Sequence, residues 1–408
     1  MIQGVPTWSH KIQAPDEGIT MAELPEVVDV VIAGGGVMGA SAAFHLAEAG
    51  VSVLLVEKSE LASGSTSKAA GGVRANFSDE LNIAMGARSL DLLADFNNRP
   101  GQEIDLHRPG YLFALTTPED VATFERSTEL HHKFGVESRM LTPQEALELS
   151  PLLNIDDVLA ASFTPNDGHC TPESVVMGYA SGARRHGATV LTNTELTGIT
   201  LSGNEITGVT TSAGNVRTSA VINCAGAWSP TVGAMVGLDL PVVPYRRELL
   251  ITEPLSDDFA DLPANMAFTI DYSTSLYWHR EGKGLLMGFS DKTVAPGFDF
   301  SRDPQFPEKL AELAYERAPR LLDVGVGSGW SGLYEVTPDH NAILGEWGNV
   351  SRFLYATGFS GHGFLQGPAI GEILRDLYLG KQPFVDISPL SADRFSSGGE
   401  LRPESNIV

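Results

Sequence analysis

The clearest pattern of apolar and polar positions runs from Val28 to Lys58, in VDVVIAGGGVMGASAAFHLAEAGVSVLLVEK. The short β-branched run Val30–Ile32 is typical of a buried parallel strand. The run Val51–Val56 predicts a second strand, and Gly50 before it stands where a helix is expected to stop. Between the two strands, apolar residues recur on one face at helical spacing, at Ala40, Ala43, Phe44 and Ala47.

Three glycines between the first strand and the helix give the spacing G-x-G-x-x-G. Gly34 permits the tight turn, Gly36 allows backbone to approach a pyrophosphate, and Gly39 allows the helix to pack closely on the strand. The N-terminus of the helix offers free N–H groups to phosphates, and Glu57 after the second strand suits the ribose hydroxyls of an adenosine. A glycine-rich turn that binds nothing is the alternative, but the whole context favours a dinucleotide.

Two further small-residue segments, together with the end of an apolar strand, favour FAD over NAD. Leu61–Glu80 and Ala356–Gly380 are rich in glycine, and Thr218–Ser229 is an apolar strand that ends on Ala-Gly. Such segments let backbone approach a large flat ligand. The second leads into a helix whose N-terminus suits the developing negative charge of a reduced flavin. Their spread along the chain fits a ligand as long as FAD.

Composition limits the function. The chain has 408 residues and a net charge of −24, which argues against nucleic acid or an anionic membrane as partner. No apolar run is long enough for a membrane span. Cys170 and Cys224 are too few for a disulfide framework, and Cys224 is expected to be a buried, inert thiol. These features favour the cytoplasm, and the irregular first residues leave open whether Met1 or Met21 is the true start.

Several motifs together resemble the D-amino-acid oxidase/sarcosine oxidase family of FAD-dependent amine oxidoreductases. The chain is most similar to sarcosine oxidase β-subunit-like and dye-linked proline dehydrogenase β-subunit-like members, and less so to dimethylglycine dehydrogenase. The motifs that carry the resemblance are GGGVMG, GSTSKAAGGVR, DGHCTPES, NCAGAW, YEVTPDHNAILG and GFSGHGF.

The resemblance implies an α/β plus α+β fold, in which a Rossmann-like FAD-binding domain is interleaved with a substrate domain built on a large antiparallel sheet. Alternating runs at Gly110–Leu115, Arg246–Glu253 and Ser275–Arg280 agree, since they predict strands outside any βαβ unit. The implied boundaries are 25–108, 162–232 and 328–390 for the FAD domain, 109–161 and 233–327 for the substrate domain, 1–24 for a flexible leader and 391–408 for a C-terminal tail.

The resemblance also implies a set of site residues. Arg74 matches an arginine that holds the substrate carboxylate, His362 lies in the GHG that the family places near the flavin, and Tyr277 is on a strand that could face the substrate. Structural roles are the alternatives: a surface ion pair, a satisfied histidine and core packing, respectively. The residues expected to contact FAD are Gly34, Gly36, Val37, Met38, Gly39, Glu57, Lys58, Ser65, Thr66, Ser67, Ala70, Gly71, Gly72, Leu196, Ala225, Gly226, Trp228, Gly332, Leu333, Phe359, Gly361, His362, Gly363, Phe364 and Leu365.

Four positions that depart from the family pattern bear on the electron acceptor and on how FAD is attached. Leu365 and Leu286 stand where monomeric sarcosine oxidases have lysines for the substrate carboxylate and for oxygen activation. A site without these two cations favours a dehydrogenase, or a slow oxidase, over a fast oxidase. Lys68 and Gly332 stand where relatives attach the flavin covalently through histidine or cysteine, so FAD is expected to be bound non-covalently.

The activity implied is oxidation of the carbon–nitrogen bond of an N-methyl or cyclic amino acid, similar to sarcosine, dimethylglycine or proline. Hydride passes to flavin N5, the imine hydrolyses, and O₂ or another carrier accepts the electrons. Partner subunits in a hetero-oligomer are compatible with the family. Two alternatives stay open: a flavoprotein subunit or assembly factor with little turnover, and an FAD-dependent hydroxy-acid dehydrogenase. No metal site is expected, and the tandem His131–His132 is expected to be solvent-exposed.

The absence of matching attachment residues generates a prediction about the cofactor. Acid precipitation of the purified protein should release yellow flavin into the supernatant, because neither Lys68 nor Gly332 can form the family's covalent links. The absorbance spectra of supernatant and redissolved pellet measure this. Flavin that stays with the denatured pellet would contradict it.

Overall fold

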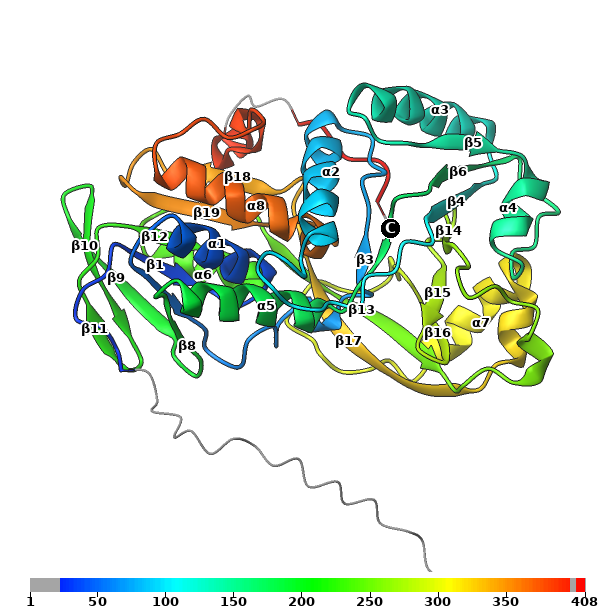
Figure 1. The fold of residues 1–408 in the computed structure, drawn as a ribbon, viewed down its shortest axis with the longest axis horizontal. Coiled ribbons are helices and arrows are strands. Elements are labelled where there is room, and N and C mark those ends of the chain that lie inside the picture. The colour runs from blue at the N-terminus through cyan, green and yellow to red at the C-terminus, as the bar shows by residue number, and fades with distance from the viewer. Residues whose placement is uncertain (1–22, 397–400, 408) are drawn as a thin grey trace, which may run out of the picture.

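One of the two large sheets of the molecule is six-stranded and mainly parallel (Figure 1). The computed structural model describes residues 23–396 and 401–407. All neighbouring strands in this sheet are parallel except the pair β18 and β19. In spatial order the strands are β18 (Ile343–Glu346), β19 (Phe353–Thr357), β12 (Val221–Asn223), β1 (Val30–Ala33), β2 (Val53–Val56) and β8 (Thr189–Leu191). Segments far apart in the sequence therefore form one sheet.

Helices cover one face of this sheet, and a small antiparallel sheet covers the other. Helix α1 (Val37–Glu48) packs between α5 (Pro172–Arg185) and α8 (Gly363–Tyr378), and α2 (Glu80–Ala94) packs on α8. The contacts are close, since a Cβ on Gly371 would come within 2.1 Å of Ser41 Oγ. The opposite face carries the short helix α6 (Ser229–Ala234) and the strands β9 (Leu196–Ser202), β10 (Glu205–Thr211) and β11 (Gly214–Val216).

The other large sheet is eight-stranded and mostly antiparallel, and only β4 and β14 pair in parallel in it. Its spatial order is β17 (Val326–Val336), β13 (Val243–Thr252), β16 (Gly284–Phe289), β15 (Tyr277–Glu281), β14 (Phe268–Asp271), β4 (Tyr111–Leu115), β6 (Ala160–Thr164) and β5 (Arg139–Leu141). The strand pair β3 (Gly72–Val73) and β7 (Gly168–His169) lies between the two sheets (Figure 1). Helices α3 (Pro118–Lys133), α4 (Pro143–Leu149) and α7 (Phe306–Arg317) complete this part. Short 3₁₀ helices occur at Thr66–Lys68, Gly226–Trp228, Asp257–Phe259, Pro319–Asp323, Ser388–Leu390 and Ala392–Phe395.

The predicted elements are confirmed. The strand–turn–helix–strand unit is β1, α1 and β2, and the alternating runs form β4, β13 and β15 in the large sheet. The fold class is the expected one, a Rossmann-like sheet together with a large antiparallel sheet. The expected leader lies mostly outside the described residues.

One histidine expectation is wrong. His131 is fully buried rather than exposed, because its ring lies between the Ser138 hydroxyl (2.9 Å) and the Phe77 carbonyl (2.8 Å). Burial lowers its pKa to about 4. His131 lies on the buried face of α3, which also carries Phe124, Ser127 and Thr128 at helical spacing.

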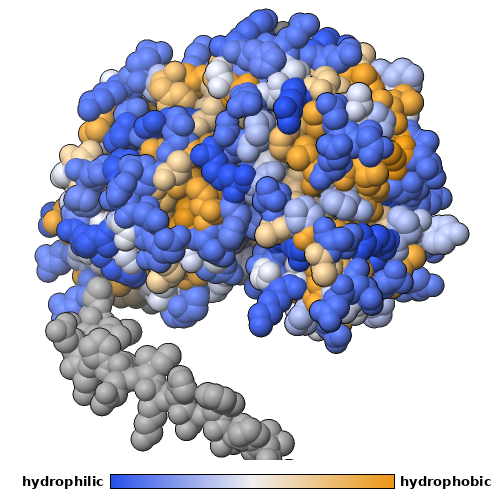
Figure 2. Space-filling model, turned by 45° about the vertical axis from the view of Figure 1, so that its right-hand side comes forward, coloured by the Kyte–Doolittle hydropathy of each residue, from blue (hydrophilic) through white to orange (hydrophobic). Residues whose placement is uncertain are grey.

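The surface is predominantly polar on the face shown in Figure 2, where hydrophobic patches lie scattered among hydrophilic side chains. Within the described ranges, none of the helices combines the length and apolarity that crossing a bilayer requires.

Residues 401–407 do not extend away from the body but dock beside the N-terminus of α2. The Glu404 carboxylate accepts hydrogen bonds from the backbone N–H and hydroxyl of Ser78 (2.8 and 2.6 Å), from the N–H of Asp79 (3.1 Å) and from the amide of Asn82 (3.0 Å). Glu404 is 2% exposed. Hydrogen bonding rather than apolar burial therefore holds this segment.

This docking predicts a measurable contribution to stability. Glu404→Ala should lower the free energy of unfolding by about 2–4 kcal/mol, because it leaves several buried donors without an acceptor. Urea denaturation monitored by circular dichroism measures the change. Glu137→Ala, at an exposed position, is the control and should leave the midpoint unchanged. Equal midpoints for the Glu404 and Glu137 variants would show that the segment contributes no stability.

Candidate functional site

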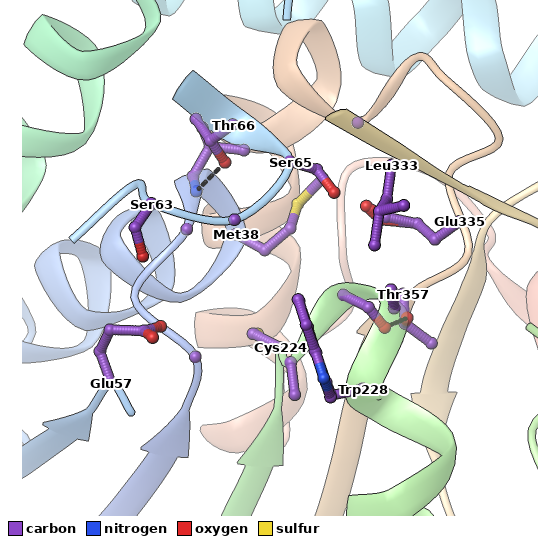
Figure 3. A pocket seen from close by; sticks show the side chains of 18 of the residues that line it. Met38, Glu57, Ser63, Ser65, Thr66, Cys224, Trp228, Leu333, Glu335 and Thr357 are labelled. Carbon is purple, nitrogen blue, oxygen red and sulfur yellow. Dashed lines mark hydrogen bonds between the residues drawn. The ribbon is translucent and has the colours of Figure 1, made fainter. Parts of the chain in front are cut away.

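A cavity of about 720 Å³ lies at the carboxyl ends of β1, β2 and β12 and reaches the large sheet (Figure 3). Carboxyl ends of parallel strands are where ligands bind in open α/β sheets. At one end of the cavity lie Glu57 and Lys58, and at the other lie Tyr334, Glu335 and Gly361. The cavity therefore connects the Rossmann-like sheet with the large sheet.

The glycine turn has the geometry that its sequence predicts. Gly34 has φ +109°, and a Cβ there would lie 2.3 Å from the Cys224 carbonyl oxygen. A Cβ on Gly39 would lie 1.9 Å from the Gly34 carbonyl oxygen, so only glycine allows α1 to sit this close to the turn. Gly36 lines the cavity directly, whereas Gly39 acts through packing.

The Glu57 carboxylate is fixed at the edge of the cavity. It accepts hydrogen bonds from the backbone N–H of Gly35 (2.7 Å) and of Ser59 (2.8 Å). Carboxylate oxygens accept more than one hydrogen bond each, so a ribose hydroxyl can add to these. Beside it, the Lys58 ammonium lies 3.4 Å from the centre of the Trp228 ring. This end has the groups that an adenosine half requires.

The N-terminus of α1 opens into the cavity. Gly36 is its N-cap and provides no side-chain cap, while the Thr66 hydroxyl accepts the Val37 N–H at 3.2 Å (Figure 3). Free N–H groups and the positive end of the helix dipole suit the phosphates of a dinucleotide. Ser63 and Ser65 extend hydroxyls into the same space.

At the opposite end, strands β13 and β17 bring an arginine and two tyrosines to the cavity side. In the antiparallel register Arg247 pairs with Gly332, and Tyr245 pairs with Tyr334. The guanidinium of Arg247 lies 5.4 Å from the ring of Tyr334, and both residues line the cavity. Sequence reasoning missed Arg247 and Tyr334, although the alternation in RRELLITE requires one of two adjacent arginines to face inward.

Glu335 is a second lining residue that was not expected. Its carboxylate lies near Gly226, at 3.6 Å from the position of a Cβ there (Figure 3). Burial raises the pKa of Glu335 to about 7, although a hydrogen bond from Ser65 opposes the shift. A carboxyl group at this end of the cavity therefore exchanges its proton near neutral pH.

The GHG motif contributes its backbone rather than its imidazole. Gly361 and Gly363 line the cavity at the N-terminus of α8, so this helix also directs its positive end toward it. The His362 side chain does not line the cavity: its Nε2 lies 3.0 Å from the His340 carbonyl oxygen. Burial lowers the pKa of His362 to about 4, and the ring is neutral at physiological pH.

Arg74 and Tyr277 lie behind the cavity wall. The Arg74 guanidinium is buried and donates from Nη2 to the Asn406 carbonyl oxygen (2.7 Å) and from Nη1 to the Asn76 carbonyl oxygen. It stacks over Phe77 at 4.1 Å. Burial and the proximity of Tyr334 raise the pKa of Tyr277, so its phenol stays protonated.

The structure brings together most, but not all, of the residues expected to contact the cofactor. Those lining the cavity are Gly34, Gly36, Val37, Met38, Glu57, Lys58, Ser65, Thr66, Leu196, Ala225, Gly226, Trp228, Gly332, Leu333, Phe359, Gly361, Gly363 and Phe364. Those outside its lining are Gly39, Ser67, Ala70, Gly71, Gly72, His362 and Leu365. Lys68 and Gly332, the two unmatched attachment positions, are neighbours, since a Cβ on Gly332 would lie 2.4 Å from the Lys68 Cβ.

A neighbouring cavity of about 980 Å³ is lined by some of the residues that do not line the first cavity. Ser67, Ala70, Gly71 and Leu286 line it. His169 and Glu281 also line it, and these two residues and the buried His279 have potential metal-ligand atoms within 4.8 Å of one another. Both ring nitrogens of His279 already face carbonyl oxygens, of Arg280 (2.7 Å) and Ala70 (3.1 Å).

Both cysteines are buried, as expected for Cys224, and burial raises the pKa of each thiol.

Comparisons with known proteins give the chain's similarity to a family model, to individual relatives and to a solved structure. The family model described as FAD dependent oxidoreductase matches residues 29–377. The chain is 31% identical to mitochondrial dimethylglycine dehydrogenase of Rattus norvegicus, over 96% of this chain and 48% of that protein, so it spans about half the relative's length. It is 29% identical to glycine oxidase of Geobacillus kaustophilus, over 90% of this chain and 97% of that protein. Its structure matches L-proline dehydrogenase from P. horikoshii with a TM-score of 0.86 and 33% identity, over 93% of this chain and 100% of that chain.

The glycine geometry generates a prediction about cofactor content. Gly36→Val should yield protein without bound FAD, because even a Cβ at this position lies 3.1 Å from Thr66 Oγ1 and the branched side chain would project into the phosphate-binding turn. The ratio of absorbance at 450 and 280 nm measures FAD content. Gly348→Val is the matched control, since nothing lies within 4 Å of a Cβ there. A Gly36 variant with the full FAD content of the control would refute the assignment of this turn.

Proposed function

Because the chain belongs to the family of FAD-dependent oxidoreductases, we propose that it oxidises the carbon–nitrogen bond of a secondary or tertiary amino acid. N-methylated and cyclic amino acids, similar to sarcosine, dimethylglycine or proline, are the proposed substrates. The similarity to a dimethylglycine dehydrogenase and to an L-proline dehydrogenase supports this class. FAD, when bound, supplies the hydride acceptor, and the imine product hydrolyses in water.

The observation that carries the proposal is the placement of two guanidinium groups beside Tyr334, that of Arg247 lining the cavity and that of Arg74 behind its wall. Arg74 and Arg247 both lie close enough to Tyr334 for their charges to act on its pKa, which burial raises. Burying a cation is costly unless an anion compensates it. In a chain of net charge −24, this local positive potential suits a substrate that carries a carboxylate.

The same environment favours the reactive form of the amine. A buried site disfavours the charged ammonium and lowers the amine pKa, so the neutral amine reacts without a strong base. The side chains around the cavity agree with this, since Tyr277 stays protonated and His362 is neutral. Glu335, whose pKa is raised to about 7, is the lining carboxyl group that can take up the amine proton.

The electron acceptor is part of the proposal. Leu365 and Leu286, at the positions where monomeric sarcosine oxidases have lysines, are buried apolar side chains. Positive charge beside a flavin assists reduction of O₂, so we propose that an acceptor other than O₂ reoxidises this protein faster. Partner subunits and a cytoplasmic location remain predictions.

A panel of amino acids tests the proposal. Under anaerobic conditions, the purified holoenzyme should lose its flavin absorbance when mixed with at least one of sarcosine, dimethylglycine or proline, and not with lactate. After reduction, a dye acceptor should restore the absorbance faster than air-saturated buffer does. Failure of every amine, or bleaching by lactate alone, would contradict the proposed substrate class, and faster reoxidation by O₂ would contradict the proposed acceptor.

A further inference from the structure

Arg247 is a cavity-lining guanidinium that has no carboxylate partner among residues 23–396 and 401–407. Its Nη1 donates to the Arg246 carbonyl oxygen at 2.9 Å and, at the long distance of 3.4 Å, to the Asp291 carbonyl oxygen. Its Nε is buried and has no hydrogen-bond partner. A guanidinium has five N–H donors in a planar fork, and the Nε and Nη2 donors of this one have no hydrogen-bond acceptor within the described part of the chain.

The adjacent arginine shows what a structural role looks like on the same strand. Arg246 forms ion pairs with Glu248 at 3.3 Å and with Asp299 at 2.8 Å. Because neighbouring residues on a strand point to opposite faces, Arg246 faces these acids and Arg247 faces the cavity. The carboxylate whose charge acts on the pKa of Arg247, that of Asp291, is already bound by Lys309 at 2.9 Å.

Space for a ligand exists beside Arg247. Arg247 and Tyr334 line the same cavity of about 720 Å³. The Lys68 side chain packs against the cross-strand neighbour Gly332, and the rings of Tyr245 and Tyr334 lie 5.8 and 5.4 Å from the guanidinium carbon of Arg247. Aromatic walls keep water away and strengthen an ionic hydrogen bond. A planar anion that enters this end of the cavity meets a two-pronged donor.

Arg74 is less available. Backbone carbonyls of Asn76 and Asn406 already accept hydrogen bonds from its two terminal nitrogens, and its side chain is outside the cavity lining. It therefore acts on a ligand in the cavity mainly through its charge, across Tyr334. A direct bidentate contact requires the other arginine.

We infer that Arg247 binds the substrate carboxylate directly and supplies the second cation that Leu365 does not. This inference rests on the proposed function, since it assumes a substrate with a carboxylate. Arg247 is then a binding residue that selects amino acids over simple amines, with Arg74 as the supporting charge.

The test measures ligand binding to the oxidised holoenzyme, independently of turnover. Pyrrole-2-carboxylate, a planar cyclic carboxylate, should perturb the visible flavin spectrum, and titration gives its Kd. Arg247→Ala should weaken binding about 10- to 100-fold, and Arg247→Lys should recover only part of it, because an ammonium lacks the fork. The neutral amide, pyrrole-2-carboxamide, should bind wild type and variant equally.

Arg246→Ala is the matched control, because it removes an arginine from the same strand but from the opposite face. It should leave the Kd of pyrrole-2-carboxylate unchanged, and all variants should keep full FAD content. The inference is overturned if wild type does not bind the carboxylate, if Arg247→Ala binds it as wild type does, or if the Arg246 variant loses as much. Loss of binding only in Arg74→Ala would also overturn it.

The amine panel separates this inference from the proposed function. If wild type binds pyrrole-2-carboxylate through Arg247 but no amino acid reduces the flavin, the proposed function fails and the carboxylate site stands. If amino acids reduce the flavin and Arg247→Ala keeps the wild-type preference for proline over pyrrolidine, the function stands and the inference fails.

Discussion

The close approach of backbone around Gly34 is the contact on which the rest of the site depends. The carbonyl of Cys224 lies where a side chain on residue 34 would be, and the carbonyl of Gly34 lies where a side chain on residue 39 would be. Strands β1 and β12 and helix α1 can meet only because both positions lack a Cβ. This contact opens the N-terminus of α1 toward the cavity and fixes one end of the cofactor site.

At the Tyr334 end of the cavity, buried positive charge rather than backbone geometry is the main feature. The chain carries an excess of acids, yet guanidinium groups of Arg74 and Arg247 are placed beside the buried phenol of Tyr334. Arg74 donates to backbone carbonyls and stacks on Phe77, whereas Arg247 faces the cavity with an Nε–H that has no hydrogen-bond partner. A site of this kind gains most from an anionic ligand, because the cost of burying the cation is already present.

The large sheet and the C-terminal segment enclose this end from two sides. Strands β13 and β17 supply the arginine and the tyrosines, while Asn406 reaches Arg74 from residues 401–407. The two ends of the cavity are therefore built by different principles: backbone geometry near Gly34, and side chains gathered from distant strands near Tyr334. The first tolerates almost no change of residue, whereas the second is the end at which we propose that the substrate carboxylate is bound.

The sequence by itself determined the parts of the protein that depend on local spacing. Gly34, Gly36, Gly39 and Glu57 lie within one strand–turn–helix–strand unit, and their placement follows from their separation along the chain. The alternating runs likewise predicted strands of the large sheet, since a period of two does not depend on distant partners.

Only the tertiary structure decided which side chains share the far end of the cavity. Arg247 faces Gly332 because β13 and β17 pair in one register, and a shift by one residue would turn Arg246 inward instead. Arg74 and His362 are in glycine-rich motifs, yet in the fold their side chains are hydrogen-bonded to the backbone carbonyl groups of Asn406 and His340, respectively. Spacing along a chain fixes what lies within a few residues, whereas register and long-range docking fix what meets across the molecule.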